Sequence, residues 1–286
     1  MKKLVWLVSY PKSGNTWFRM FLANYLKKAQ EPVPLEEIQP ASISSDSVDF
    51  EEITGLNPFE LAPDEVDIYR PEVYRYLSLN TENDCNFIYK KTHDAYTLNI
   101  LDKPLFPEDV SKSAVYFIRN PLDVCVSYAN HGTDKIDKKI DFILDEGAIL
   151  AGKRKGQLRQ IMMSWKSHVQ SWKNQSLIPI HFVRYEDMVQ KPVETFGDII
   201  QFLGLEYDTE LLRRAIMNSN FRILQQMEQE NGFQEKMQLC KSFFWKGKIG
   251  NYHNFLSDEQ VNRIVKYNYD TMREFGYIDK EGKLTV

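Results

Sequence analysis

The sequence predicts an α/β protein with a central, mostly parallel β-sheet flanked by helices. Short apolar runs typical of buried strands recur along the chain, and longer segments with helical periodicity alternate with them. The first apolar run leads through a polar, glycine-containing loop into a helix, which is a P-loop-like order of elements. With 286 residues, 43% hydrophobic content and no internal repeat or low-complexity linker, the chain is expected to form a single domain over residues 1–286.

The expected strands are apolar runs that end at polar or turn-forming residues. Residues 4–8 are apolar throughout, as expected for a strand that is covered on both faces. This run ends in Tyr-Pro-Lys-Ser-Gly, a turn with proline and glycine at residues 10–14. The other expected strands span residues 86–91, 114–118 and 178–183.

The expected helices have apolar residues at helical spacing and begin at capping residues. We expect Asn15 to be the N-cap of a helix over residues 15–28. Asn120 is the expected N-cap of a second helix over residues 121–131, with Pro121 at the first helical position, where a missing N–H costs nothing. Further helices are expected over residues 158–172, 193–203, 209–217 and 258–275.

One acidic segment differs from the rest of the chain. Residues 31–75 carry twelve Asp and Glu side chains but only two arginines, Arg70 and Arg75. Two interpretations are open: a solvated acidic surface segment, or a lid over a substrate site that prefers cationic groups.

Composition and cysteine usage exclude several classes of protein. The formal net charge of −4 argues against nucleic-acid binding, which normally needs a basic face. Cys85, Cys125 and Cys240 are far apart and form no CxxC pair, so a reducing compartment is expected, and zinc-site spacing is absent. The apolar run at residues 4–8 is too short for a signal peptide, and no stretch approaches the roughly 20 apolar residues of a membrane span. We therefore expect a cytoplasmic protein with no membrane partner.

The loop after the first expected strand has the residue types of an anion site. A helix N-terminus directs backbone N–H groups at one point, and Gly14 allows close approach of the backbone. Ser13 and Thr16 add hydroxyl donors, and Lys12 adds a full charge. The order differs from Walker A, where the lysine follows the second glycine, because Lys12 precedes the only glycine. The loop by itself also fits an ordinary polar turn at the surface.

Two further residues lie where an α/β sheet places its ligands. Arg119 leaves an expected strand just before a helix N-terminus, where a guanidinium can bind a phosphate through two hydrogen bonds. Two such junctions fit a ligand with separate 5′ and 3′ phosphates better than they fit ATP. His93 follows the expected strand 86–91, and an imidazole with its ordinary pKa near 6.5 can deprotonate a hydroxyl near neutral pH. A lone histidine or Arg-Asn-Pro junction can also be purely structural.

Together these motifs resemble the PAPS-dependent sulfotransferase family, in its soluble, cytosolic-type, small-molecule branch and of a bacterial type. Residues 11–17 (PKSGNTW) resemble the family's 5′-phosphosulfate loop PKSGTTW, with Asn15 in place of the first threonine. Residues 119–127 (RNPLDVCVS) resemble its 3′-phosphate motif RNPxDxxVS, and residues 91–93 match its KTH motif. The resemblance implies 3′-phosphoadenosine-5′-phosphosulfate (PAPS) as cofactor, adenosine 3′,5′-bisphosphate (PAP) as product, and no required metal.

The resemblance also implies a role for each matching residue. His93 is the implied catalytic base, Lys12 stabilises the leaving phosphate, and Ser127 contacts that lysine. Trp245 stands where the family has an arginine, so this arginine contact is not expected here. The residues implied in binding PAPS are Lys12, Ser13, Gly14, Asn15 and Thr16 at the 5′-phosphate, Trp17, Tyr185, Ser219 and Phe221 around adenine, and Arg119, Ser127, Trp245, Lys246 and Gly247 at the 3′-phosphate.

The predicted function is therefore transfer of a sulfuryl group from PAPS to a hydroxyl or amine of a small-molecule acceptor, either cationic or phenolic, by in-line displacement. Two alternatives stay open at this point: a P-loop-type kinase that uses ATP, and a catalytically silent nucleotide-binding protein. The sequence does not indicate the oligomeric state.

Overall fold

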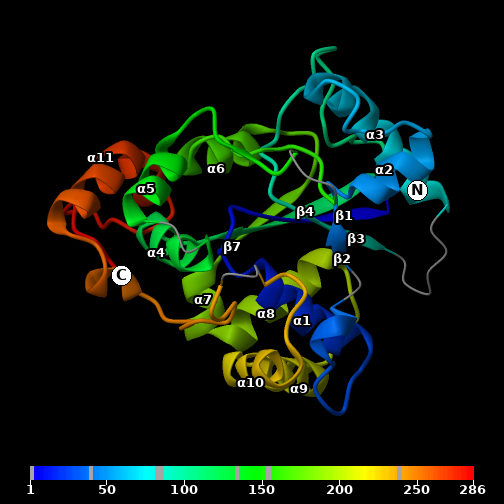
Figure 1. The fold of residues 1–286 in the computed structure, drawn as a ribbon. Helices are drawn as coiled ribbons and strands as arrows, with labels where there is room; N and C mark the ends of the chain where they lie inside the picture. The colour runs from blue at the N-terminus through cyan, green and yellow to red at the C-terminus, as the bar shows by residue number, and fades with distance from the viewer. Residues whose placement is uncertain (1–2, 39–40, 81–86, 133–134, 153–155, 237–239) are drawn as a thin grey trace. The chain divides into compact units, whose positions relative to one another are not determined.

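The structure is a computed structural model that describes residues 3–38, 41–80, 87–132, 135–152, 156–236 and 240–286 (Figure 1). Cys85, Asn86 and two residues of the acidic segment, 39 and 40, lie outside this part of the chain. The described residues form two compact units. The first unit comprises residues 1–10, 40–116 and 146–181, and the second comprises residues 11–39, 117–145 and 182–286. The single domain over residues 1–286 stays a prediction.

A five-stranded parallel sheet has the strand order β2-β3-β1-β4-β7. Its central strand β1 (Leu4–Ser9) pairs in parallel with β3 (Ile88–Thr92), which pairs in parallel with β2 (Ala41–Ile43). β4 (Ser111–Ile118) and β7 (Ile180–Arg184) complete the sheet, and the boundaries between the units fall inside these two strands. All six residues of β1 are buried, as expected for a strand covered on both faces. The predicted α/β class is confirmed.

The first unit holds three helices among its described residues: α2 (Ser47–Thr54), α3 (Pro63–Asn80) and α6 (Trp165–Asn174). It also holds a small antiparallel pair, β5 (Ile149–Leu150) with β6 (Gln160–Ile161). Helices α2 and α3 lie side by side (Figure 1) and bury Phe50, Val66, Val73 and Leu158 between them and the chain near β6.

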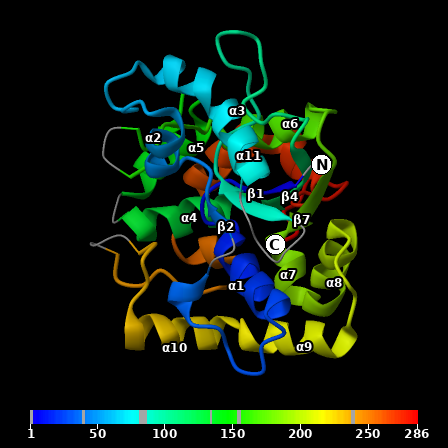
Figure 2. The same ribbon diagram turned by 90° about the vertical axis from the view of Figure 1, so that its right-hand side faces the viewer.

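The second unit consists mainly of helices. Figure 2 shows α9 and α10 in one row, separated by Ser219 and Asn220, and the Asn220 side chain caps α10 by accepting from Arg222 N and Ile223 N. Its helices are α1 (Asn15–Leu26), η1 (Leu35–Glu37), α4 (Pro121–Gly132), α5 (Ile136–Leu144), α7 (Tyr185–Gln190), α8 (Pro192–Leu203), α9 (Thr209–Asn218), α10 (Phe221–Asn231), η2 (Asn251–Asn254) and α11 (Asp258–Glu274).

Two predicted local structures are wrong. Asn15 is not an N-cap: Gly14, in the left-handed region with φ 100°, takes that place, and α1 has no side-chain cap. The helix predicted over residues 158–172 begins only at Trp165, after an N-cap at Ser164 whose hydroxyl accepts from Ser167 N. Residues 160–161 are extended instead, because Ile161 O accepts from Ala95 N.

Several further elements have no counterpart in the prediction. The acidic segment, expected as a surface segment or lid, contains β2, α2 and most of α3, and helices α5, α7 and α10 were not predicted either. The remaining predicted elements are present, and their ends differ from the prediction by at most three residues. β4 begins at Ser111, three residues earlier than expected, and α4 follows Asn120, whose side chain accepts from Leu122 N at 3.0 Å as an N-cap does.

Candidate functional site

The predicted anion loop has an unusual backbone. Lys12 and Gly14 both have positive φ angles, 69° and 100°. A Cβ atom on Gly14 would lie 2.8 Å from the Tyr185 ring, so this position requires glycine for space as well as for conformation. Helix α1 starts at Asn15 without a side-chain cap, and a helix N-terminus is a favourable place for an anion.

Three buried donors around this loop make no hydrogen bond with any residue that the structure describes. They are the Ser13 hydroxyl, the Trp17 indole N–H and the Nε–H of Arg119. Buried donors are normally satisfied in folded proteins, so a cluster of unsatisfied ones fits a ligand that accepts hydrogen bonds. Together with the positive φ angle of Gly14, these donors fit the phosphate groups of a nucleotide.

Arg119 connects two loops of the second unit. Its Nη1 donates to Lys12 O at 3.1 Å, its Nη2 donates to Lys248 O at 3.0 Å, and the guanidinium carbon lies 4.2 Å from the centroid of the Tyr185 ring. Burial raises the pKa of the Tyr185 hydroxyl, so the ring packs there as a neutral group. Arg119 therefore lies beside the predicted 5′-phosphate loop, and its cation is stacked on an aromatic face.

Asp123 fixes the loop that carries Trp245, Lys246 and Gly247. Its buried carboxylate accepts from Gly250 N and from Tyr252 N, both at 2.9 Å. Asp123 was not among the predicted site residues, although it is the aspartate of the RNPxDxxVS match.

A pocket of about 470 Å³ lies between α10 and this loop. It brings three predicted residues together: Phe221, Trp245 and Lys246. Gly247 is tightly packed here, because a Cβ atom on it would lie 2.6 Å from the Phe221 ring. The other lining residues, which were not predicted, are Arg222, Gln225, Lys248, Asn251 and Asn254. Three cationic side chains thus surround one pocket, an environment that favours an anion.

The remaining predicted residues of the second unit have more local surroundings. The Trp17 ring packs edge-on against Tyr185 and Phe196. Ser127 is half-buried in α4. Ser219 is fully buried, and its hydroxyl donates to Ala215 O at 2.7 Å, so it stabilises the end of α9.

Two side chains of the anion loop contact the segment before Trp245. The Lys12 ammonium lies 4.0 Å from the centroid of the Phe243 ring. The Thr16 hydroxyl donates to Glu235 at 3.2 Å, and Arg19 forms an ion pair with the same carboxylate. Glu235 and Arg19 were not predicted, and no motif in the sequence marks them.

His93 belongs to the first unit, directly after β3. Its Nδ1 lies 2.7 Å from Ser9 O and 3.3 Å from Ser9 Oγ. A carbonyl oxygen can only accept, so Nδ1 carries the proton and donates it, and Nε2 carries the lone pair. Ser9, at the end of β1, had no sequence signal for this role. The hydrogen bond gives His93 the tautomer in which Nε2 can act as a base.

A parallel sheet whose first strand leads into a glycine loop with buried donors, together with an arginine at a second strand–helix junction, defines a nucleotide-binding α/β protein. Comparison with known proteins identifies the family. A family model of the sulfotransferase domain matches residues 2–276, and the chain belongs to this family. The predicted reaction class, transfer of a sulfuryl group, is confirmed.

Individual relatives are similar over most of the chain. Cytosolic sulfotransferase 10 of Arabidopsis thaliana is 26% identical over 278 residues, covering 90% of this chain and 74% of the relative. Flavonol 3-sulfotransferase of Flaveria bidentis is 25% identical over 283 residues, covering 92% and 79%. A crystal structure of mouse sulfotransferase SULT7A1 complexed with PAP has a TM-score of 0.59 at 19% identity, covering 96% of this chain and 84% of that one, which shows a shared fold.

No helix in the described ranges is long and apolar enough to cross a membrane.

Proposed function

We propose that this protein transfers the sulfuryl group of PAPS to a phenolic hydroxyl of a small acceptor, with His93 as the base and Lys12 as the group that stabilises the leaving phosphate. The observation that carries the proposal is the 2.7 Å contact between His93 Nδ1 and Ser9 O, because it leaves the lone pair on Nε2. Ser9 and Lys12 are three residues apart in the chain, on either side of the strand–loop junction.

The residues present fit both phosphates of PAPS. In the proposal the 5′-phosphosulfate is held by Lys12, Ser13, Gly14, Asn15 and Thr16, through the N-terminus of α1 and the unsatisfied Ser13 hydroxyl. The 3′-phosphate is held by Arg119 and Ser127 and by the loop of Trp245, Lys246 and Gly247. The adenine lies against Trp17, Tyr185, Phe221 and the end of α9 at Ser219. In this loop Trp245 stands where the family has an arginine. Lys248 and Arg222, which line the same pocket as Lys246, supply cationic charge there instead.

PAPS supplies a sulfuryl group activated as a mixed anhydride with phosphate. His93 Nε2 takes the proton of the acceptor hydroxyl as the acceptor oxygen forms its bond to sulfur. The bond between sulfur and the bridging oxygen breaks, and the electron pair goes to the 5′-phosphate of PAP. The Lys12 ammonium, assisted by Ser127, balances the charge that develops on that phosphate, an effect greatest in the transition state.

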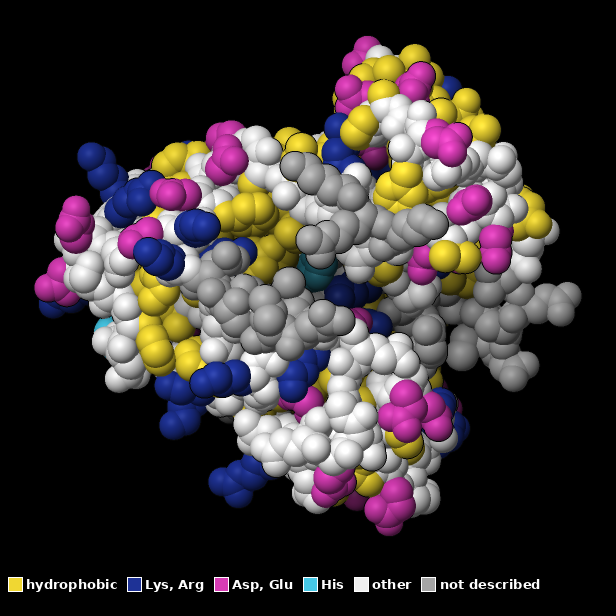
Figure 3. All heavy atoms as spheres, in the orientation of Figure 1, with side chains coloured by type: hydrophobic (Ala, Val, Ile, Leu, Met, Phe, Trp, Pro, Cys, Tyr) yellow, Lys and Arg dark blue, Asp and Glu magenta, His cyan; other side chains and the backbone are white. Residues whose placement is uncertain are grey.

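Two observations support a phenolic acceptor over a cationic one. One of the relatives is named for flavonols, which are phenols. In addition, many acidic side chains of the 31–75 segment already have partners within the first unit. Asp49 pairs with Lys90, Asp64 and Asp67 pair with Arg159, and Glu72 pairs with Arg75. Figure 3 shows that the acidic side chains over α2 and α3 are interleaved with hydrophobic ones. An amine acceptor, a lid in this segment and a cytoplasmic location remain parts of the prediction.

Binding of PAP tests the nucleotide site without knowledge of the acceptor. We expect PAP to stabilise the protein by about 2.7 kcal/mol at 100 times its Kd, and 5′-AMP and ATP to stabilise it less, as measured by thermal shift. Stabilisation by ATP but not by PAP would contradict the proposal and favour a kinase.

Replacement of His93 tests the base. We expect His93→Ala to lower kcat by about 10²–10⁴-fold with PAPS and a panel of phenols, while Kd for PAP stays the same. His253 is a matched control, because His253→Ala removes an exposed imidazole of the second unit. Full turnover in His93→Ala would contradict the role of His93.

A further inference from the structure

The carbonyl group of His93 is bound by a second, fully buried histidine. His168 on α6 has its Nε2 atom 3.0 Å from His93 O and its Nδ1 atom 2.7 Å from the Tyr116 hydroxyl. A carbonyl can only accept, so Nε2 of His168 carries the proton and Nδ1 accepts from Tyr116. Burial lowers the pKa of His168 to about 4, which keeps this ring neutral. The two histidines therefore have opposite tautomers, and each donates to one backbone carbonyl.

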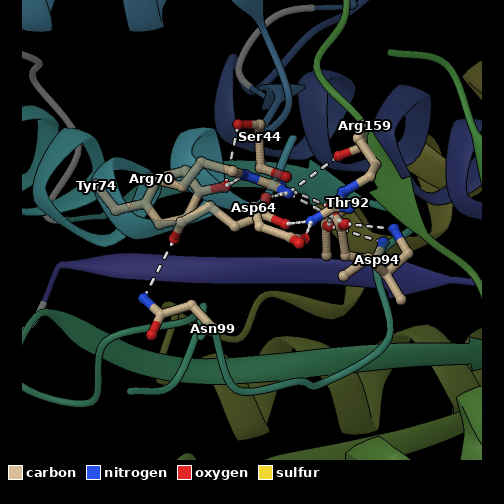
Figure 4. A network of polar contacts seen from close by, with 10 residues as sticks. Ser44, Asp64, Arg70, Tyr74, Thr92, Asp94, Asn99 and Arg159 are labelled. Atoms are coloured by element: carbon tan, nitrogen blue, oxygen red, sulfur yellow. Dashed lines mark hydrogen bonds and ion pairs between the residues drawn. The ribbon is translucent and has the colours of Figure 1, made fainter. Parts of the chain in front are cut away.

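The next residue, Asp94, is held equally firmly. Its buried carboxylate accepts hydrogen bonds from both Nη atoms of Arg70, at 2.7 Å and 3.2 Å (Figure 4). It also accepts from Ile161 N at 2.9 Å. Arg70 is fully buried too. Burial alone would lower its pKa, but the carboxylate of Asp94 raises it well above the usual value, so the guanidinium stays charged.

Arg70 also bonds to Tyr74 on its own helix, α3, and to the chain just before β6. It donates to Arg159 O at 3.1 Å and to the Tyr74 hydroxyl at 3.1 Å, and Tyr74 in turn donates to Ser44 O (Figure 4). The carbonyl of Asp94 accepts from the Trp172 indole at 2.9 Å. Side chains from α3 and α6 and a backbone N–H of β6 thus converge on residues 93 and 94.

We propose that His168 and Arg70 are positioning residues that hold the backbone of His93 and Asp94, so that the imidazole of His93 keeps its hydrogen bond to Ser9 O and presents Nε2 to the acceptor. This inference rests on the proposed role of His93 as base. Neither residue touches the reacting atoms in this arrangement. The physical reason is that a base gains its effect only when it is held in the correct geometry, and a displacement of 1 Å can cost about 100-fold in rate.

Two substitutions of His168 separate positioning from packing. In His168→Phe the ring remains but the N–H that binds His93 O is lost, whereas His168→Gln keeps an N–H donor. We expect His168→Phe to lower kcat by about 100-fold with KM and Kd for PAP unchanged, and His168→Gln to recover at least a tenth of the wild-type kcat. Arg70→Lys, which cannot bind both carboxylate oxygens, is expected to lower kcat in the same selective way.

Ser111→Ala is the matched control. Ser111 is buried in the same unit and bonds to Trp6 and to Pro107 O, away from residues 93 and 94. We expect this variant to lower the Tm but to keep the wild-type kcat. If His168→Phe and Ser111→Ala lower kcat to the same extent, or if His168→Gln is no better than His168→Phe, the positioning role is wrong.

A spectroscopic measurement does not depend on turnover. The ring nitrogens of ¹⁵N-labelled histidine report the tautomer, and the His93 signals are identified by their loss in His93→Ala. We expect the Nδ1–H form of His93 in the wild type and a mixture of forms in His168→Phe, in which His93 O has lost the N–H that binds it. A pure Nδ1–H form in His168→Phe would overturn the inference. Wild-type turnover in His93→Ala would instead disprove the base itself.

Discussion

Two backbone carbonyls and one hydroxyl determine the tautomers of His93 and His168. Ser9 O fixes the proton of His93 on Nδ1, while His93 O and Tyr116 fix the proton of His168 on Nε2. At the proposed nucleotide site, the Arg119 guanidinium stacks on the Tyr185 ring and has an unsatisfied buried Nε–H. These contacts lead to two predictions for single residues.

The first concerns Arg119. We expect Arg119→Ala to raise Kd for PAP by about 10- to 100-fold, because a charge-assisted hydrogen bond contributes about 1.5–3 kcal/mol. Binding of 5′-AMP, which lacks the 3′-phosphate, should weaken much less, and only because the links to Lys12 O and Lys248 O are lost. Calorimetric titration of both nucleotides measures the difference. Equal losses for both would remove Arg119 from the 3′-phosphate site.

The second concerns the pH dependence of stability. The pKa of His168 falls from 6.5 in the unfolded chain to about 4 in the folded protein, because burial disfavours the charged ring. Between these values the unfolded state binds more protons, so this contribution to stability is complete above pH 6.5 and is lost as the pH falls towards 4. The loss should reach about 3 kcal/mol near pH 4.

Urea denaturation at pH 7, 5.5 and 4 compares the wild type with His168→Gln. The variant should lack this part of the pH dependence, while the contributions of carboxylates are common to both proteins. Identical pH profiles would mean that His168 is not buried as a neutral group.

At the scale of elements, the loops around the candidate site are held by carboxylates. Asp123 at the start of α4 accepts two backbone N–H groups of the 250–252 turn. Glu228 on α10 similarly accepts from Phe243 N, Phe244 N and the Ser242 hydroxyl. These hydrogen bonds lower the pKa of Glu228 although burial would raise it. Both carboxylates hold the ends of the loop that carries Trp245 and Lys246.

Replacement of Asp123 should therefore affect stability and nucleotide binding together. In Asp123→Asn an amide replaces one accepting oxygen, and we expect a loss of about 1–3 kcal/mol in the free energy of unfolding with a higher Kd for PAP. Ser257→Ala is the control, since it removes the capping box of α11 in the same unit and should cost about 0.5–2 kcal/mol without changing Kd. An unchanged Kd in Asp123→Asn would show that the loop does not contribute to the nucleotide site.

At the scale of the whole molecule, the acidic segment is a folded part of the protein. Asp46 caps α2, and Asp67 and Asp94 enclose the buried guanidinium of Arg70. An exposed salt bridge contributes little, but removal of one partner from a buried pair is strongly destabilising. Several carboxylates of this segment therefore stabilise the structure.

Charge reversal at exposed positions tests whether this segment selects the acceptor. Glu51 and Glu52 on α2 are both exposed, so Glu51→Lys with Glu52→Lys should leave the fold intact. We expect unchanged KM for phenolic acceptors, since the proposed acceptor carries no positive charge. Steady-state kinetics with matched neutral and cationic phenols measures this, and a KM that rises only for the cationic ones would restore the cationic interpretation.

The sequence by itself determined four strands of the central sheet, helices α1, α4, α8, α9 and α11, and the family, because these depend on local periodicity and on residue types at fixed spacing. The tertiary structure decided what no local pattern contains. Ser9, His168 and Arg70 reach His93 and Asp94 from positions 24 to 84 residues away in the chain. The start of α6 and the N-cap of α1 differ from the prediction for the same reason: long-range contacts at Ile161 and the close packing of Gly14 on Tyr185 outweigh local preference.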